Sequence, residues 1–408
     1  MGLLPPWADP NDVPLATWAH SVTPKKTETA LVAAPGRVDL KRATTLSGAR
    51  LSLYGSTRAP GCEGRWLHVG LSAWLCSDLA ELSPEPPADD TLSLASDGLP
   101  YRYYFVGKRG AAGYANLARA GEEAPDEELD PGFAIATTED RTEQGQHWLH
   151  TRHGTWVAAS DLGTAHPSGF HGEEVGAEGL SFAWALRDHV SVYASPTLSG
   201  KPVSTLTRRE VVRWREDKAV AGSHAVRISD DGVTPSQWVD AHALAHPILA
   251  PPPPEALAET WIDIELATQT LVAYEGPTPI FATLVSTGIG QGTADTATHK
   301  GTFRIWVKLL SSTMDNLESP DNQDARPAKE GARYSMEDVP YVQFFDKAIA
   351  LHGVFWHDDF GHIHSHGCVN LAPRDAARLF GLTSPRLTAG LSAVLPARIE
   401  PGTVVRVR

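Results

Sequence analysis

The residues best suited to chemistry lie in one short C-terminal stretch, where a cysteine directly follows a histidine and a glycine. The stretch Ser365–Asn370 reads Ser-His-Gly-Cys-Val-Asn, and its Cys368 is one of three cysteines in a chain of 408 residues. A second His-Gly pair, His352-Gly353, precedes Cys368 by sixteen positions. That separation leaves room for a strand, a loop and a second strand that return the histidine to the cysteine.

These residue types predict nucleophilic catalysis by a Cys/His pair. A cysteine attacks as its thiolate, so it needs a partner that takes its proton and donors that hold the oxyanion formed on the attacked carbonyl. His352 or His366 can take the proton, and Gly367 lets the backbone turn so that N–H groups near Cys368 face a substrate carbonyl.

Two other interpretations of the same residues compete with this one. Histidines and acidic residues are frequent between residues 352 and 366: His352, His357, Asp358, Asp359, His362, His364 and His366. Alternation would place the last three histidines on one face of a strand, where they could hold zinc. Their spacing matches no familiar zinc pattern and no Cys-x-x-Cys is present, so we expect no metal and no cofactor. In the other interpretation neither residue is catalytic: Cys368 is a small buried apolar residue and His352 is a core residue.

The C-terminal sequence resembles the L,D-transpeptidase (YkuD-like) catalytic domain over about residues 255–408. Ser-His-Gly-Cys-Val at 365–369, preceded by His-Gly, matches the signature of that family. Four further stretches follow in the family's order: Trp261–Ile264, Val285–Gly288, Gly301–Phe303 and Leu351–Gly353.

The resemblance implies a role for each motif residue. The family fold is a mostly antiparallel β-sandwich or barrel-like domain, with the cysteine at the end of a groove under a flap. Cys368 would be the nucleophile and His352 the general base, with its imidazole oriented by a carbonyl of Gly353 or Ser365. His366, Gly367 and Cys368 would line the oxyanion hole with backbone N–H groups.

Four other positions carry over as substrate-binding residues. Asn370 would support the loop, although many relatives carry Arg two positions after the cysteine, so a carboxylate contact made by that Arg has no counterpart here. Tyr334, Met336 and Trp356 match the flap and groove that hold the peptide stem.

The implied reaction is acyl transfer on peptidoglycan stem peptides. Cys368 would attack the carbonyl of the L-configured centre of a diamino acid that precedes a terminal D-amino acid, release that residue, and pass the acyl group from a thioester to an amine of another stem. Two alternatives stay open: an L,D-carboxypeptidase or endopeptidase that uses water as acceptor, and a wall-binding protein with an inactive catalytic domain.

Upstream, a tryptophan pattern recurs. Trp66 and Trp74, then Trp148 and Trp156, stand eight positions apart around a central glycine, and a looser copy ends at Trp238. Apolar strands around a glycine turn predict hairpins, and the pattern resembles bacterial SH3-like (SH3b) modules. Each Trp is better explained as a core residue of a small barrel than as a residue that stacks on a ligand.

The predicted fold is therefore mainly β. A C-terminal β-sandwich or barrel-like domain with one or two short helices follows three small SH3-like β-barrels. The expected boundaries are an extended arm at 1–28, modules at 29–90, 98–168 and 180–248, a Pro-rich linker at 249–256 and the catalytic domain at 257–408. Pro251–Pro254 should form a stiff spacer, Ser311–Arg333 a flap or disordered segment, and Pro373–Phe380 a helix that stops at Gly381.

The amino-acid composition limits the classes of partner that we expect the protein to bind. Lys and Arg total 35 against 49 Asp and Glu, and the net charge of −14 would repel nucleic acid and anionic membranes. No apolar run is long enough to span a bilayer, and we expect a monomer. Cys62 and Cys76 flank a predicted hairpin, where a disulfide or two free buried thiols are both possible. A bridged pair beside one working cysteine suits the cell envelope or periplasm, with the signal peptide absent from this chain.

Overall fold

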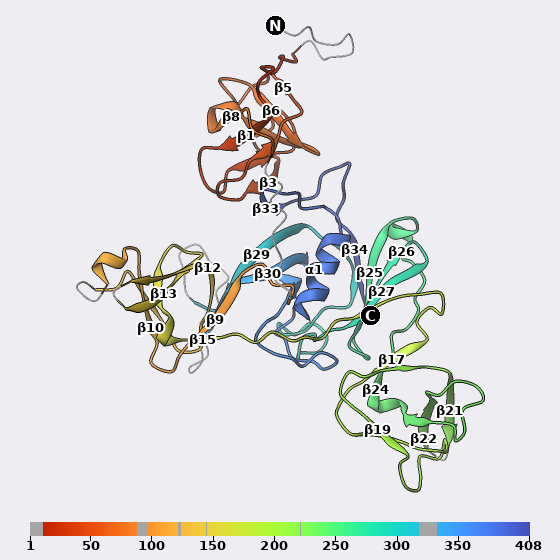
Figure 1. The fold of residues 1–408 in the computed structure, drawn as a ribbon. Coiled ribbons are helices and arrows are strands. Elements are labelled where there is room, and N and C mark those ends of the chain that lie inside the picture. The colour runs from red at the N-terminus through yellow and green to blue at the C-terminus, as the bar shows by residue number, and fades with distance from the viewer. Residues whose placement is uncertain (1–10, 88–96, 121–123, 144, 221, 318–332) are drawn as a thin grey trace.

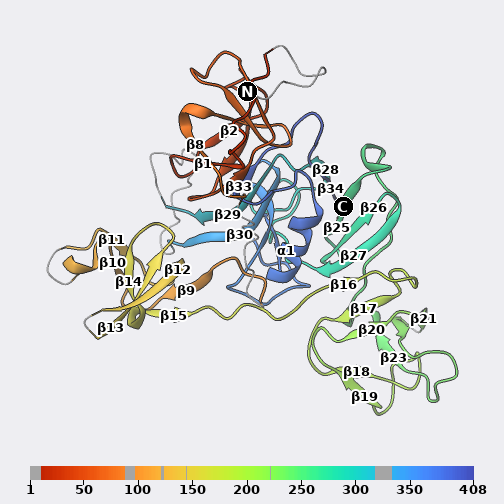
Figure 2. The same cartoon turned by 45° about the horizontal axis from the view of Figure 1, so that its top comes forward.

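The protein has a central C-terminal domain from which three smaller β-units project in different directions (Figure 1). This architecture comes from a computed structural model that describes residues 11–87, 97–120, 124–143, 145–220, 222–317 and 333–408. Figure 2 shows the same arrangement from a second angle, with α1 lying in the central domain. The described residues are mainly β, as predicted, with one α-helix.

Two sheets enclose the core of the C-terminal domain. The elements are β25 (Thr260–Glu265), β26 (Thr270–Glu275), β27 (Thr278–Leu284), β28 (Gly301–Arg304), β29 (Val307–Asp315), β30 (Ser335–Asp346), β31 (Ile349–Gly353), β32 (Val369–Leu371), α1 (Pro373–Leu382), β33 (Leu391–Val394) and β34 (Val404–Val407). The first sheet has the order β27-β26-β25-β34-β28 and the second β33-β29-β30-β31-β32. Apolar side chains of both, such as Ile262, Leu271 and Leu351, pack into one core together with Leu379 of α1.

Two local predictions in this domain need correction. The helix does not stop at Gly381 but continues to Leu382, where the N–H of Thr383 still donates to the carbonyl of Leu379. The polar segment predicted as a flap or disordered begins as regular structure, because Ser311–Asp315 pair with β30. Its residues 318–332 lie outside the described part of the chain.

The three N-terminal units consist of short strands. The first contains β1 (Ser21–Pro24), β2 (Ala30–Val32), β3 (Lys41–Thr45), β4 (Leu51–Ser52), β5 (Gly55–Thr57), β6 (Trp66–Gly70), β7 (Ala73–Cys76) and β8 (Ala80–Ser83). The second contains β9 (Arg102–Val106), β10 (Ala111–Tyr114), β11 (Glu127–Leu129), β12 (Ala134–Glu143), β13 (Gln146–Thr151), β14 (Trp156–Ala158) and β15 (Leu162–Thr164). After β16 (Glu173–Glu174), the third contains β17 (Phe182–Ala185), β18 (Val190–Val192), β19 (Ser204–Leu206), β20 (Val211–Arg213), β21 (Glu216–Val220), β22 (Ser223–Arg227), β23 (Trp238–Asp240) and β24 (Leu244–Ala245).

The tryptophan pattern corresponds to a repeated local structure. Trp74, Trp156 and Trp238 each lie on the second strand of a hairpin, namely β6–β7, β13–β14 and β22–β23. In every copy a single 3-10 turn and then a short strand follow. Trp66, Trp156 and Trp238 are buried, in line with the expected core role, whereas Trp74 and Trp148 are only half-buried.

The first unit begins earlier than predicted. Residues 1–28 were expected to form an extended arm, but β1 (Ser21–Pro24) pairs along its whole length with β8 and also with β4. Val22 is fully buried in the core of this unit. The error arises because a four-residue strand whose longest pairing is with a strand some sixty residues away leaves no local periodicity.

The Pro-rich stretch is not a spacer that holds the units away from the C-terminal domain. The carbonyl of Pro251 accepts a hydrogen bond from Arg406 at 2.9 Å, and the N–H of Ala250 donates to the Tyr274 hydroxyl at 3.0 Å. Trp184 of the third unit and Trp261 of β25 share one buried cluster. The prolines therefore lie against the domain surface, because the units on either side pack together.

The other two units are also joined to the C-terminal domain by hydrogen bonds. β3 of the first unit pairs with β33. In the second unit β12 forms a bridge to β30 between Ala134 and Met336. The Tyr103 hydroxyl donates to the carbonyl of Asp338 at 2.6 Å, and the Tyr103 ring stacks on Phe355 with centroids 4.1 Å apart. These contacts place the second unit against β30.

Cys62 and Cys76 form a disulfide with Cα atoms 5.6 Å apart, so of the two possibilities the bridged pair holds.

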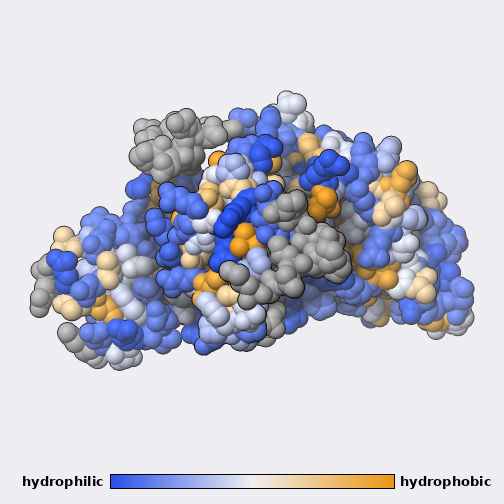
Figure 3. Space-filling view, turned by 90° about the horizontal axis from the view of Figure 1, so that it is seen from above, coloured by the Kyte–Doolittle hydropathy of each residue, from blue (hydrophilic) through white to orange (hydrophobic). Residues whose placement is uncertain are grey.

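Figure 3 shows a face dominated by hydrophilic side chains, with hydrophobic ones in small separate areas. Within the described residues, no helix combines the length and apolar character needed to cross a membrane.

A buried acid at the junction with the second unit should make stability depend on pH. Burial raises the pKa of Glu337 to about 8, and its carboxyl accepts a hydrogen bond from the N–H of Ala136 at 3.4 Å. A folded-state pKa above the unfolded value stabilises the fold at low pH, and this stabilisation is lost as pH rises through about 8. At pH 8.5 the free energy of unfolding of a Glu337→Gln variant should therefore exceed that of wild type by about 3 to 5 kcal/mol.

Urea unfolding at pH 5.5 and 8.5 checks this expectation. The exposed Glu81→Gln change on β8 serves as the control and should leave the pH dependence of wild type intact. If Glu337→Gln and wild type lose stability in parallel between the two pH values, the buried acid is not responsible.

Candidate active site

The strand register brings the predicted nucleophile and base onto one face of a sheet. β31 and β32 run parallel, with His352 paired to Asn370 and Leu351 to Val369. Because side chains alternate along a strand, Cys368, one residue before β32, lies on the same face as Asn370 and His352. The sixteen residues between His352 and Cys368 form the connection between two neighbouring strands.

His352 is held in one tautomer. Its ring is buried, and Nδ1–H donates to the carbonyl of Gly353 at 3.1 Å. The alternative carbonyl, that of Ser365, instead accepts from the N–H of Ile289 at 2.9 Å. Burial lowers the pKa of His352 to about 4. The imidazole is therefore neutral at pH 7, and its Nε2 carries a free lone pair that can take a proton.

Cys368 carries the free thiol of the chain and is partly exposed. Its Sγ lies 3.8 Å from the carbonyl oxygen of Ala348. Burial raises the pKa of the thiol above its usual range, and a backbone hydrogen bond from Ala350 acts in the opposite direction. The thiol and the imidazole are thus both neutral at rest, so attack by sulfur would require proton transfer at the same moment.

The turn before Cys368 is held by hydroxyl groups. Gly367 has φ of +128°, a conformation that favours glycine. Its N–H donates to the Ser365 hydroxyl at 3.1 Å, and its carbonyl accepts from the Thr298 hydroxyl at 2.7 Å. The Ser365 hydroxyl in turn donates to the carbonyl of Cys368. Since the N–H of Gly367 already has an acceptor, the oxyanion hole would rely on the N–H groups of His366 and Cys368.

Asn370 joins the site to a histidine that the sequence reasoning considered only as a metal ligand. The amide of Asn370 lies 2.8 Å from Nε2 of His357, whose Nδ1 accepts the N–H of Asp359 at 3.2 Å. The amide atom that faces the ring is the nitrogen Nδ2, which forms the hydrogen bond with Nε2. Burial, with His364 acting in the same direction, lowers the pKa of His357 to about 4.

Two of the three predicted groove residues, Met336 and Trp356, share an apolar cluster with Cys368. The Trp356 ring lies 6.0 Å from the ring of His352. Tyr334 is 41% exposed. Burial, Asp315 and the sulfur of Cys368 all raise the pKa of its phenol, which places Tyr334 within electrostatic reach of the thiol.

The histidine tract does not form the strand on which a shared zinc-binding face was considered. Residues 361–364 have no strand structure, and His362, His364 and His366 are exposed. Among the described residues, the one group of three metal-type ligand atoms close together is Cys62, Cys76 and Asp78, in which the two cysteines are already bonded to each other. Sequence reasoning missed Thr298 and the pairing of His357, because neither stands in a recognisable motif.

Comparison with known protein families gives a match over the C-terminal domain. Residues 259–407 match the model of YkuD, the L,D-transpeptidase catalytic domain. A search of the curated proteins finds no match.

Solved structures include several with related domains. The catalytic domain of an L,D-transpeptidase from Enterococcus faecium is 23% identical, with 37% of this chain and 98% of that chain aligned and a TM-score of 0.25. An L,D-transpeptidase from Stackebrandtia nassauensis is 27% identical, over 36% of this chain and 55% of that chain, with a TM-score of 0.23. One from Mycobacterium smegmatis is 15% identical, over 48% and 99%, with a TM-score of 0.27. By the family match, residues 259–407 are therefore similar to the L,D-transpeptidase catalytic domain.

Proposed function

We propose that the chain is a peptidoglycan L,D-transpeptidase in which Cys368 forms a thioester with a stem peptide and transfers it to an amine. The observation that supports this most directly is the β31–β32 register, which sets Cys368 on one face with a histidine whose Nδ1–H is already engaged. A base that is neutral and has its lone pair on Nε2 is what a thiol needs to become a nucleophile.

In the first half-reaction the thiol proton moves to Nε2 of His352 as sulfur attacks the carbonyl carbon that precedes the terminal D-amino acid. The negative charge that develops on the carbonyl oxygen is held by the backbone N–H groups of His366 and Cys368. The tetrahedral intermediate then breaks its C–N bond, and His352 returns the proton to the departing amine. A thioester on Cys368 and a free D-amino acid result.

In the second half-reaction an amine of another stem attacks the thioester and loses its proton to His352. The C–S bond breaks, and the thiolate recovers the proton from His352. Tyr334, Met336 and Trp356 hold the donor stem beside the sulfur. Asn370, fixed by His357 and by its paired hydrogen bonds with the backbone of Ser286, keeps the nucleophile loop in place.

We further propose that the N-terminal units are SH3-like modules that hold a monomeric enzyme at the cell wall. The repeated hairpin, 3-10 turn and strand support three copies of one unit, with the first starting near residue 21 rather than 29. Action outside the cytoplasm is supported by the Cys62–Cys76 disulfide, since such bonds persist in oxidising compartments.

Product analysis tests the function. The protein is incubated with disaccharide tetrapeptides, and the muropeptides are separated and weighed. Cross-linked dimers, each with the loss of one terminal D-amino acid, are expected. Trimmed monomers alone would identify water as the acceptor and make the enzyme a carboxypeptidase or endopeptidase. No new product, together with no mass increase on the protein after exposure to a carbapenem, would leave a wall-binding protein with an inactive domain.

The carbapenem is a suitable second probe because the Enterococcus faecium catalytic domain has been solved in a form acylated by ertapenem. A β-lactam carbonyl reacts with the same thiol without an acceptor amine. It therefore separates a failure of nucleophilic attack from a failure of transfer.

A further inference from the structure

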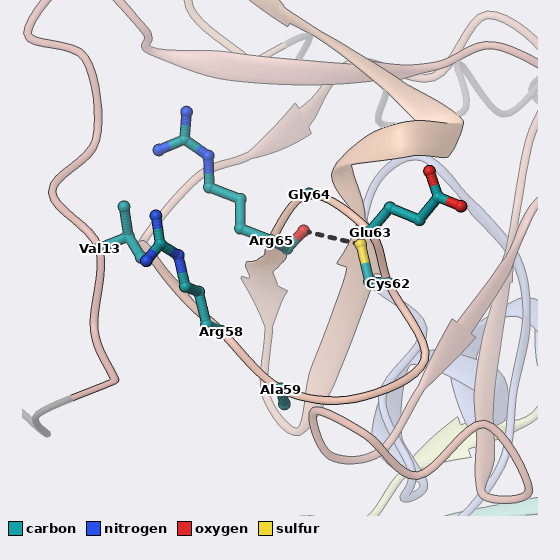
Figure 4. Close-up of a pocket in the computed structure, with 7 residues that line it drawn as sticks. All are labelled: Val13, Arg58, Ala59, Cys62, Glu63, Gly64 and Arg65. Carbon is teal, nitrogen blue, oxygen red and sulfur yellow. Dashed lines mark hydrogen bonds between the residues drawn. The ribbon is translucent and has the colours of Figure 1, made fainter.

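The first N-terminal unit contains a cavity of about 670 Å³ beside the Cys62–Cys76 disulfide. The residues that line it are Val13, Arg58, Ala59, Cys62, Glu63, Gly64 and Arg65. None of these residues takes part in the site around Cys368. Figure 4 shows Arg58 and Arg65 extending to the same side of the loop, toward the segment that carries Val13, while Glu63 points to the other side.

Arg58 and Arg65 form no ion pair with any carboxylate of the described residues. Acids outnumber bases by 49 to 35, and most arginines of the described residues form an ion pair with a carboxylate. The side-chain contact of Arg65 is a donation to the carbonyl of Pro14 at 3.3 Å, which orients its guanidinium and leaves other N–H donors free.

The loop that presents Arg65 is rigid. The N–H groups of Glu63 and Gly64 donate to the carboxylate of Asp78 at 2.9 and 3.1 Å, and the N–H of Arg65 donates to the Ser77 hydroxyl at 3.0 Å. A side chain on Gly64 would displace the Ser77 hydroxyl and the Asp78 carboxylate that accept these hydrogen bonds. With Cys62 joined to Cys76, the loop is held at both ends, and little conformational entropy remains to be lost on binding.

From these observations we propose that the cavity binds an oxyanion group of a polymer. A planar guanidinium donates two parallel hydrogen bonds to a carboxylate or a phosphate, and two of them on one cavity wall suit a ligand with repeated negative charge. The overall charge of −14 repels anions at long range, so binding must come from this local pair. The volume accommodates several atoms beyond the charged group.

Two wall sources supply such a group: the carboxylates of peptidoglycan stems and the phosphodiesters of an anionic wall polymer. The choice of wall polymers rests on the proposed function, whereas the oxyanion chemistry does not. Binding would position the first unit, and through β3–β33 the C-terminal domain, along the polymer.

The test uses the full chain carrying Cys368→Ala, so that no substrate is consumed. Three probes are titrated by calorimetry: a stem tetrapeptide with a free C-terminal carboxylate, the same peptide as its C-terminal amide, and a short glycerol phosphate oligomer. The Arg58→Ala/Arg65→Ala double variant should bind the preferred anionic probe at least tenfold more weakly. Arg58→Lys/Arg65→Lys should recover only part of the affinity, because an ammonium lacks the paired donors.

The matched control is Lys26→Ala, which removes an exposed cation from the same unit away from the cavity. It should stay within twofold of the parent. Preference for the acid over the amide would identify the stem carboxylate, and preference for the glycerol phosphate the phosphodiester. Equal affinity of parent and double-alanine variant for all three probes, or an equal loss with Lys26→Ala, would overturn the proposal. Since catalysis at Cys368 is absent throughout, this outcome would not affect the proposed transpeptidase activity.

Discussion

A Cys368→Ala variant is expected to form no covalent adduct with a stem tetrapeptide or a carbapenem, while wild type gains the mass of one acyl group. The turnover rate should fall by at least about 10³-fold, because loss of a catalytic nucleophile leaves only the contribution of binding and oxyanion donors. Intact mass spectrometry measures the adduct, and muropeptide analysis measures turnover.

The other two cysteines cannot supply a second nucleophilic thiol in this experiment. Cys62 and Cys76 are joined, so Cys368 carries the free thiol, and thiol titration should change from one group to none in the variant. The thermal midpoint should stay within a few degrees of wild type, because the sulfur is partly exposed and its hydrogen bond to Ala348 is long. An adduct of undiminished yield on the alanine variant would exclude Cys368 as the nucleophile.

The second large effect is expected at His352. A His352→Gln variant should acylate about 10² to 10⁴ times more slowly, since it lacks the group that takes the thiol proton. The His366→Gln control should stay within about threefold, because that exposed residue contributes through its backbone N–H.

The pH profile of wild type tests the same role without any substitution. Burial lowers the pKa of His352 to about 4, so the base stays unprotonated well below the ordinary histidine range. Acylation by a carbapenem should therefore show no loss between pH 7 and 5.5 and should decline only toward pH 4. A decline centred near 6.5, or a loss in His366→Gln as large as in His352→Gln, would assign the proton to another group.

Local sequence patterns predicted much of the C-terminal domain. The alternation in Trp261–Ile264 and the Pro373 helix start correspond to β25 and α1. Both signals depend on residues a few positions apart, which set backbone hydrogen bonding and the buried face together. The same holds for the hairpins around Trp74 and Trp156, where strand and turn are neighbours in the chain.

Predictions that depended on distant partners failed. Ser21–Pro24 is a strand because β8 and β4 pair with it, and Pro251 lies on the domain because Arg406 donates to its carbonyl. Read alone, either segment is polar or proline-rich and shows no period. Neither could be recognised before the units were placed together, because the stabilising contacts come from residues tens to more than a hundred positions away.

The stretch Ser365–Asn370 shows the same division within the site. By itself the sequence determined the nucleophile candidate, the upstream His-Gly pair and the glycine that the turn requires, since these follow from residue type and spacing. Only the tertiary structure decided which carbonyl orients His352. It also decided that the N–H of Gly367 donates to the Ser365 hydroxyl and that Asn370 forms a hydrogen bond with His357. Those choices depend on the register of β31 against β32 and on loops that meet only in the folded protein, where each buried polar group must find its own partner.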